Sequence, residues 1–209
     1  MRPYEKDPQA IYAASFATVR KEAALTRFPA DVAEVAVRVI HACGMVEIAD
    51  RLDYSDDVAA SAVAALRAGA PVYADCEMVA SGITRRLLPG TGIRCTLNDD
   101  AVAGLARDLG TTRSAAAVDL WETEGAVIAI GNAPTALFRL LERLDEGAPR
   151  PAAILAFPVG FVGAAESKAE LAQRPRATPF LTLRGRKGGS AMASAAVNAL
   201  GLLAGGGVQ

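Results

Sequence analysis

The sequence predicts a three-layer α/β/α sandwich on about five mainly parallel strands, with extra helices at the N-terminus. After Gly69, short apolar runs alternate with segments of helical periodicity, the pattern of parallel strands joined by helices. The runs at 126–130 and 152–157 have no polar face, as expected of strands that helices bury on both sides. A length of 209 residues fits one domain over residues 1–209, and no linker or internal repeat interrupts it.

The first third of the chain is predicted to be helical. Apolar residues recur at helical spacing over residues 8–25, which predicts a first helix. Asp31 is expected to be the N-cap of a second helix over residues 31–43, because Glu34, three residues later, completes a capping box. A third helix is expected over residues 55–68.

The remaining elements alternate between strand and helix. The five apolar runs that predict strands are 71–75, 92–96, 126–130, 152–157 and 179–183. The helices are expected at about 98–109, 112–123, 133–146, 164–173 and 190–203.

In such a sheet, ligands bind at the carboxyl ends of the strands. The glycine-rich segment 185–190 follows the last strand and precedes a helix, so it is a candidate anion-binding turn. A plain β–α turn is the alternative.

Composition excludes several classes of protein. Lys and Arg number 22 against 23 Asp and Glu, so the chain lacks the basic excess of a nucleic-acid binder. No signal peptide and no uncharged helix long enough to cross a membrane are expected. Cys43, Cys76 and Cys95 are odd in number and widely spaced, which excludes a disulfide framework and favours the reducing cytoplasm.

Familiar cofactor and metal motifs are missing. The Gly90–Gly92 pair lacks the third glycine of a dinucleotide fingerprint, and no phosphate-binding loop motif occurs. One histidine and three scattered cysteines do not make a closed zinc site, and the Asp56–Asp57 and Asp99–Asp100 pairs are typical of helix starts. No G-x-S-x-G motif supports a nucleophilic triad. No metal and no cofactor is therefore expected.

The single histidine, His41, is the candidate catalytic group. Arg38 lies three residues earlier and so on the same face of the helix. A histidine beside a cation and a bound carboxylate is a candidate proton donor. In the alternative, His41 is structural and Arg38 pairs with Glu34 at the i, i+4 position.

Three further residues are weaker candidates. Arg113 opens a predicted helix, where a cation opposes the helix dipole, so it is a candidate for holding an anion. Thr84 and Ser15 are polar residues in apolar surroundings, and bonding to the local backbone is their alternative role.

Several segments, in order along nearly the whole chain, resemble the precorrin-8X methylmutase family of cobalamin biosynthesis. Together they are more specific than any single motif. The segments are Ile11-Tyr-Ala-Ala-Ser-Phe, Val37-Arg-Val-Ile-His-Ala-Cys-Gly, Ala68-Gly-Ala-Pro, Cys76-Glu-Met-Val-Ala-Ser-Gly-Ile-Thr-Arg, Asn132-Ala-Pro-Thr-Ala-Leu-Phe, Pro158-Val-Gly-Phe-Val-Gly-Ala-Ala-Glu-Ser-Lys and Arg184-Gly-Arg-Lys-Gly-Gly-Ser-Ala-Met.

The resemblance implies an isomerase that moves the methyl group on C11 of precorrin-8X, a tetrapyrrole-derived macrocycle, to C12, forming hydrogenobyrinate. It implies that His41 donates a proton to a ring nitrogen and that no metal or organic cofactor takes part. A flavodoxin-like sheet and a homodimer with a shared active site are also implied. The residues on which the family's substrate-binding positions fall are Ser15, Arg38, Thr84 and Arg113.

The chemistry of this reaction fits the residues. A rearrangement within a bound substrate needs a protonation and a shaped pocket rather than a nucleophile. The carboxylates of the substrate suit forked arginine side chains. Three alternatives remain open: a cobalt-precorrin-8 methylmutase, a non-catalytic tetrapyrrole-binding protein, and a phosphate- or nucleotide-binding enzyme, which the missing fingerprints disfavour.

Overall fold

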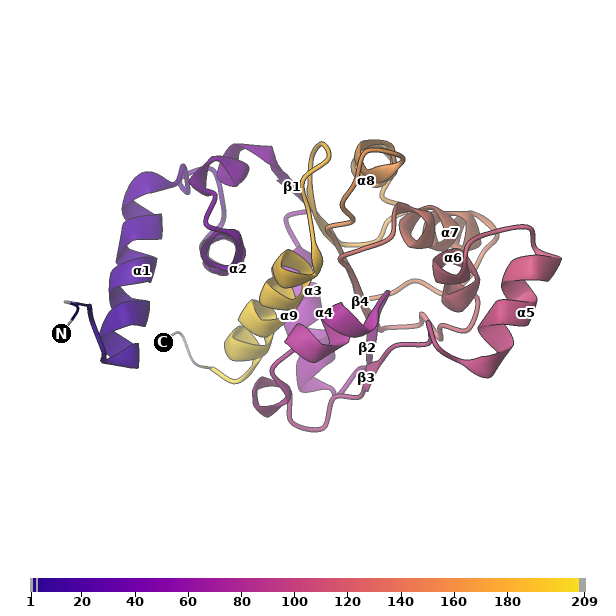
Figure 1. Cartoon of the computed structure of the whole chain (residues 1–209), viewed down its shortest axis with the longest axis horizontal. Helices are drawn as coiled ribbons and strands as arrows, with labels where there is room; N and C mark the ends of the chain where they lie inside the picture. The colour runs from indigo at the N-terminus through magenta and orange to yellow at the C-terminus, as the bar shows by residue number, and fades with distance from the viewer. Residues whose placement is uncertain (1, 3, 207–209) are drawn as a thin grey trace.

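A mainly parallel sheet lies between two layers of helices in the computed structural model, which describes residue 2 and residues 4–206 (Figure 1). Its strand order is β1-β6-β5-β4-β2-β3, and all pairs are parallel except β1 with β6. Without β1, this is the 2-1-3-4-5 order of flavodoxin-like folds, which confirms the predicted architecture. The strands are β1 (Leu52–Tyr54), β2 (Val72–Ala74), β3 (Ile93–Arg94), β4 (Val127–Ile130), β5 (Ala153–Ala156) and β6 (Phe180–Leu183).

Each face of the sheet packs on its own set of helices. Val127 and Ala129 point into the core on one face, whereas Ile128 and Ile130 point into the core on the other. The strands are therefore apolar along their whole length, as the sequence predicted. The first face is covered by α2 (Ala30–Cys43), α3 (Val58–Arg67), α4 (Glu77–Gly82) and α9 (Ser190–Ala204). The second is covered by α6 (Arg113–Val118), α7 (Pro134–Asp145) and α8 (Ala164–Gln173), with α5 (Asp100–Asp108) packed against α6.

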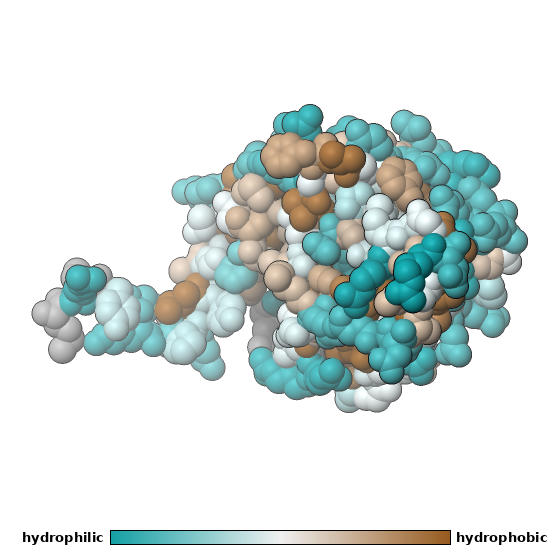
Figure 2. Space-filling view, turned by 45° about the vertical axis from the view of Figure 1, so that its right-hand side comes forward, coloured by the Kyte–Doolittle hydropathy of each residue, from teal (hydrophilic) through white to brown (hydrophobic). Residues whose placement is uncertain are grey.

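The N-terminal helix α1 (Pro8–Glu22) stands outside the sandwich. It packs on α2, and Val19 is its one buried residue (Figure 1). Figure 2 shows the N-terminal part of the chain projecting from the body, with a hollow beside it. Of the helices expected as N-terminal additions, α1 is therefore the additional layer, while α2 and α3 belong to the sandwich.

Four short elements were missed by the sequence prediction of about five strands. The edge strand β1 follows a 3-10 helix, η1 (Val46–Arg51), and pairs antiparallel with β6. After β2 come α4 and a second 3-10 helix, η2 (Arg85–Leu87). Each is too short to show a period in the sequence.

The predicted capping of α2 was wrong. Pro29 is the N-cap, and Asp31 lies in the first turn, where its carboxylate accepts a hydrogen bond from the Val32 amide at 2.8 Å. The prediction for α5 is confirmed, because Asp99 is its N-cap and accepts from the Ala101 amide at 3.0 Å.

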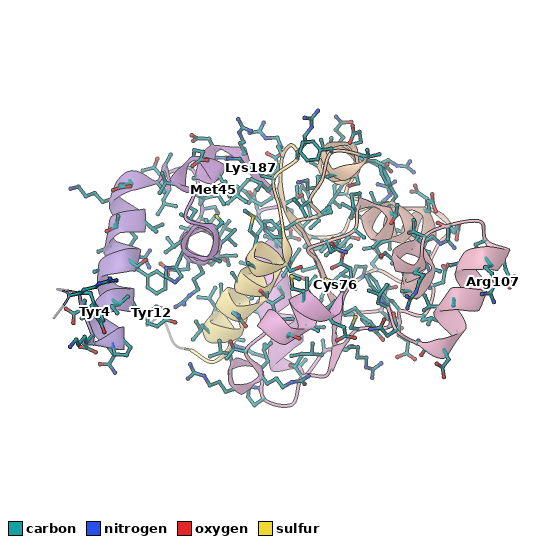
Figure 3. The ribbon with its side chains drawn as sticks, in the orientation of Figure 1. Tyr4, Tyr12, Met45, Cys76, Arg107 and Lys187 are labelled. Atoms are coloured by element: carbon teal, nitrogen blue, oxygen red, sulfur yellow. The ribbon has the colours of Figure 1, made fainter. Side chains whose placement is uncertain are left out.

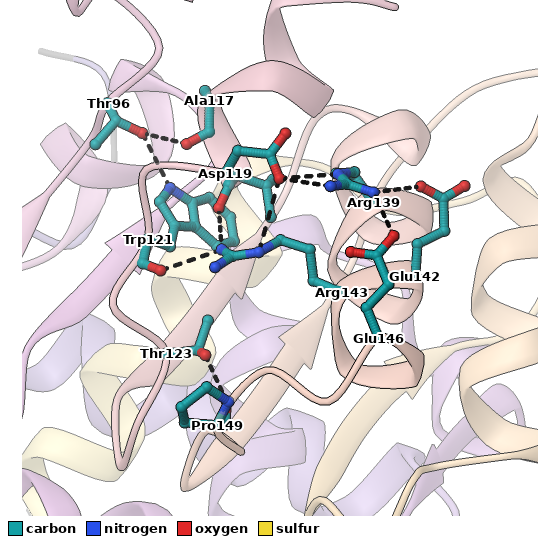
Figure 4. A network of polar contacts seen from close by, with 11 residues as sticks. Thr96, Ala117, Asp119, Trp121, Thr123, Arg139, Glu142, Arg143, Glu146 and Pro149 are labelled. Atoms are coloured by element: carbon teal, nitrogen blue, oxygen red, sulfur yellow. Dashed lines mark hydrogen bonds and ion pairs between the residues drawn. The ribbon is translucent and has the colours of Figure 1, made fainter. Parts of the chain in front are cut away.

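Helix α6 ends at Val118, five residues earlier than predicted. Arg143 of α7 donates to the carbonyls of Val118 and Trp121, at 2.5 and 3.1 Å (Figure 4). Arg139 binds the Asp119 carboxylate at 2.8 Å in the same network. Because α7 takes carbonyls that a longer helix would use internally, the chain turns away here toward β4.

The uncharged stretch near the C-terminus forms α9 at the centre of the first helical layer. Within the described part of the chain, no helix is long and apolar enough to cross a membrane.

Candidate active site

A cavity of about 880 Å³ lies on the outer side of α9, between α1, α2 and η2. Its floor is a face of α9 that carries small side chains, including Ala191, Ser194 and Ala195. Tyr12 of α1 lines the opposite side, and Figure 3 shows it on the side of α1 that faces α9. The cavity lies near the upper end of the ~300–1,000 Å³ range of small-molecule sites.

His41 lines this cavity from the last turn of α2. Its Nδ1 lies 2.8 Å from the Ser15 hydroxyl of α1. The rings of Phe16 and Tyr12 flank the imidazole, at centroid distances of 4.9 and 5.7 Å. Since Ser15 occupies Nδ1, Nε2 is the ring nitrogen available to a ligand.

Arg38 lines the same cavity one turn before His41. Its guanidinium lies over the Phe16 ring, 4.9 Å from the centroid. Burial lowers the pKa of Arg38, and the nearby negative charge of Glu34 opposes this effect. Glu34 also forms an ion pair with Arg20 of α1 at 2.7 Å, so α1 is anchored beside the cavity.

Thr84 lines the opposite wall, just before η2. The Thr84 amide donates to Oδ1 of Asn198 at 2.7 Å, and Nδ2 of Asn198 donates to the Gly82 carbonyl at 3.0 Å. One side chain of α9 therefore fixes the backbone on both sides of Ile83.

Arg113 does not reach this cavity within one chain. It begins α6, as predicted, and donates to the Leu97 carbonyl at 3.0 Å and to Asn98 Oδ1 at 3.3 Å. Helix α6 packs on the sheet face opposite the one that carries α2 (Figure 1). The structure thus brings together His41, Ser15, Arg38 and Thr84, and leaves Arg113 apart.

The usual ligand crevice of this fold is closed by a side chain. In flavodoxin-like order, the ligand crevice opens between β2 and β4, where the strand order reverses. Asp75 follows β2 and is 2% exposed. Its carboxylate accepts hydrogen bonds from the amides of Gly131, Asn132 and Ala133 after β4, at 2.9, 3.0 and 2.7 Å. Burial raises the pKa of Asp75, and the three amides oppose that rise.

The glycine-rich segment 185–190 is also packed against a strand end. A Cβ at Gly188 would collide with the Phe157 carbonyl, and the Gly189 amide donates to that same carbonyl at 2.8 Å. None of the described residues that line the cavity belongs to these strand ends, so a site at the carboxyl ends of the strands stays a prediction. The cavity lies one layer further out, against α9.

Metal ligands do not gather within the described residues, where no three His, Cys, Asp or Glu side chains are placed to hold an ion. The cysteines are free thiols. Burial raises the pKa of the Cys43 thiol, and that of Cys95 to about 11, so both are protonated at neutral pH.

Among the polar residues of the cavity wall that sequence reasoning missed are Arg86 and Asn198. Asn198 had one usable signal, because it interrupts a helix that is rich in Ala and Leu and carries no charged residue. Arg86 is one of two adjacent arginines, and only the fold distinguishes them.

The fold and the cavity define an α/β enzyme whose single histidine faces a large cationic pocket. The precorrin-8X methylmutase family model matches residues 10–203. Precorrin-8X methylmutase of Pseudomonas aeruginosa is 58% identical over 96% of this chain and 98% of its own, and that of a Sinorhizobium species is 56% identical over 94% and 95%. Cobalt-precorrin-8 methylmutase of Salmonella typhimurium is 40% identical over 94% and 96%.

A solved structure gives the same result. Precorrin-8X methyl mutase from Thermus thermophilus superposes with a TM-score of 0.85 and 37% identity, over 96% of this chain and 98% of that one. The chain belongs to the precorrin-8X methylmutase family and is an isomerase of cobalamin biosynthesis.

Proposed function

We propose that this isomerase moves the C11 methyl group of precorrin-8X to C12 and releases hydrogenobyrinate. The observation that carries the proposal is the placement of His41, held by Ser15, in the wall of a cavity that the described residues line with two arginines and with no carboxylate side chain. A macrocycle with several acetate and propionate groups is a ligand that such a cavity favours.

In this proposal, His41 donates a proton from Nε2 to a ring nitrogen of the bound substrate. Protonation draws electron density through the conjugated ring, so that the methyl group can migrate from C11 to C12. Substrate and product are isomers, so a proton returns to His41 and the enzyme ends each cycle unchanged. Arg38 holds a substrate carboxylate beside His41, and Thr84 contacts the substrate from the opposite wall.

The metal-free macrocycle is the substrate that sequence similarity favours. The relatives named for precorrin-8X share clearly more residues with this chain than those named for cobalt-precorrin-8. The second candidate is the cobalt-containing substrate. Comparing kcat/KM for the two substrates decides between them, and a higher value for cobalt-precorrin-8 would reverse the assignment.

The central test replaces His41. In the His41→Ala variant, we expect no change in the absorption spectrum when precorrin-8X is added, apart from that of binding. The variant should still bind hydrogenobyrinate in equilibrium dialysis, which shows that the cavity is intact. Turnover at the wild-type rate would contradict the proposed role of His41. Binding of precorrin-8X to the wild-type protein without conversion would instead support a non-catalytic corrinoid-binding protein.

We further propose a homodimer with a shared active site, working in the cytoplasm. Arg113 and His41 lie on opposite sides of the sheet, so one macrocycle is within reach of both only if they come from different chains. Free thiols at Cys43, Cys76 and Cys95 fit a reducing compartment.

Subunit complementation tests the shared site. We expect the His41→Ala and Arg113→Gln homodimers each to be inactive or nearly so. When the two chains are co-expressed in equal amounts, half of the dimers are mixed, and each mixed dimer has one site with both residues intact. About a quarter of wild-type activity should return. If no activity returns although mixed dimers are isolated by two affinity tags, the two residues do not share a site across subunits.

A further inference from the structure

Arg86 is a cavity residue for which the described residues provide no electrostatic partner. It lies in η2, is exposed and lines the cavity. No hydrogen bond or ion pair joins its side chain to the rest of the described chain. By contrast, Arg139, Arg143 and Arg176 each bind carboxylates or carbonyls.

The charged side chains that line the cavity are positive. Among the described residues, Arg38 and Arg86 are the charged side chains that line it, and no Asp or Glu does. The whole chain carries a formal charge of −1, so this concentration of positive charge is local. A guanidinium without a partner in such a wall is available for a planar anionic group, above all a carboxylate.

The backbone under Arg86 is held firmly. Asn198 binds the Gly82 carbonyl and the Thr84 amide on one side of η2. On the other side, Gly201 of α9 accommodates Leu88, because a Cβ there would lie 2.9 Å from Leu88 Cδ2. A fixed backbone sets the point from which the Arg86 side chain extends before the ligand arrives, so this segment does not have to be ordered on binding.

Arg86 and Arg38 approach the cavity from different sides. Helix α2, which carries Arg38, packs along α9, and η2 packs on α9 further along the cavity. The small side chains of α9 form the floor between them. A flat macrocycle on this floor presents carboxylates at its rim in both directions.

We infer that Arg86 binds a rim carboxylate of the corrinoid and determines substrate affinity, and that Asn198 positions Arg86 by fixing η2. This inference rests on the proposed function. Arg86 is a binding residue and takes no part in the proton transfer, so its loss affects KM far more than kcat.

The test compares Arg86→Gln with the matched control Arg85→Gln. Arg85 is the adjacent residue in η2, is also exposed and is not among the residues that line the cavity. We expect Arg86→Gln to raise the Kd for hydrogenobyrinate in equilibrium dialysis, and the KM for precorrin-8X, about tenfold, with kcat within about twofold. Arg85→Gln should remain near wild type. Arg86→Lys should recover part of the affinity, since it keeps the charge but loses the fork.

Two results would overturn the assignment. One is an equal weakening of hydrogenobyrinate binding by Arg86→Gln and Arg85→Gln, which would indicate electrostatic attraction without a specific contact. The other is a wild-type Kd for hydrogenobyrinate in Arg86→Gln. Hydrogenobyrinate binding is measured without turnover. If the wild-type protein binds the product but does not convert precorrin-8X, the proposed function is wrong. The effect of Arg86→Gln on the Kd for hydrogenobyrinate can still be measured in that case.

Asn198→Ala tests the positioning role. If Asn198 acts through Arg86, its replacement weakens hydrogenobyrinate binding in the wild-type background and has much less effect in the Arg86→Gln background. Equal effects in both backgrounds would show that Asn198 acts independently of Arg86 and would remove it from the inference.

Discussion

The Ser15 hydroxyl sets the orientation of the His41 ring. It lies 2.8 Å from Nδ1 and belongs to α1, whereas the histidine belongs to α2. The bond ties the orientation of the His41 ring to the position of α1 and leaves Nε2 as the ring nitrogen that this hydroxyl does not occupy. Although resemblance to the family predicts a substrate contact for Ser15, this geometry favours a positioning role.

Replacing Ser15 should therefore affect the chemical step. In Ser15→Ala, we expect kcat to fall about tenfold and KM to change less than twofold, because the imidazole loses its partner while the walls remain. Ser15→Thr, which keeps the hydroxyl, should recover much of the rate. Steady-state kinetics on precorrin-8X provides the measurement.

Thr18→Ala is the matched control for this prediction. Thr18 lies on the same helix, and its hydroxyl donates to the Ala14 carbonyl at 2.9 Å instead of to a cavity residue. It should leave kcat and KM unchanged. A raised KM with normal kcat in Ser15→Ala would show that Ser15 binds substrate directly.

At the scale of elements, Gly131 is where β4, α4 and α9 meet. A Cβ there would lie 2.7 Å from both Ser190 Cα and Val79 Cγ2. One of these contacts is backbone, so the helices must move apart. We expect Gly131→Ala to lower the free energy of unfolding by about 2–3 kcal/mol in urea titrations.

At Gly104, in the middle of α5, we expect replacement by alanine to change the free energy of unfolding in the opposite direction. Apart from its chain neighbours and the backbone of its own helix, no atom of the described chain lies within 4 Å of a Cβ built there. Gly104→Ala should raise the free energy of unfolding by roughly 0.5–1 kcal/mol, because alanine loses less conformational entropy in a helix. Destabilisation of similar size in both variants would contradict the packing argument at Gly131.

Element prediction succeeded where the hydrophobic period extends over several turns or a whole buried strand. Helices α2 and α7 and strands β4 and β5 were placed within one or two residues. Strand β1 has three residues and was missed because its pairing with β6 is decided by tertiary contact. The end of α6 was misplaced for a similar reason, since arginines of α7 decide it.

For the molecule as a whole, Lys168 is an unusual buried charge. It is 1% exposed, and its ammonium donates to the Lys187 carbonyl at 2.5 Å, joining α8 to the loop before α9. Burial lowers the pKa of Lys168 from its ordinary value of 10.5 to about 8. The unfolded chain therefore binds this proton more tightly than the folded protein does.

Stability should consequently rise with pH between about 8 and 10.5. For this one group, we expect a gain of about 2–3 kcal/mol in the free energy of unfolding from pH 7 to pH 10. Lys168→Met lacks the titrating group, so its stability relative to wild type should fall by that amount over the same range. Urea titrations of both proteins at pH 7, 8, 9 and 10 measure it.

Lys21→Met is the control, because Lys21 is exposed on α1. Its stability should follow that of wild type at every pH. If the free energies of unfolding of Lys168→Met and wild type change in parallel with pH, burial does not lower the pKa of Lys168.

How residues from distant segments combine into a site could be predicted only in part. His41 and Arg38 share a helix face, so their spacing alone places them together. Asn198 and Arg86 join them through α9 and η2, and no local pattern specifies that contact. The position of the cavity against α9 could not be predicted from the sequence either, because the glycine-rich strand ends suggested a ligand site at the edge of the sheet.

The Asp75 carboxylate affects which small molecules can bind at the crevice between β2 and β4. Proteins with this strand order commonly receive flavin or nucleotide phosphates at the crevice where Asp75 sits. Here the chain supplies its own counter-ion to those amides. We therefore expect ATP and FMN not to bind at this crevice, because the amides that would hold their phosphates already bind Asp75, whereas the cavity against α9 is open to a ligand.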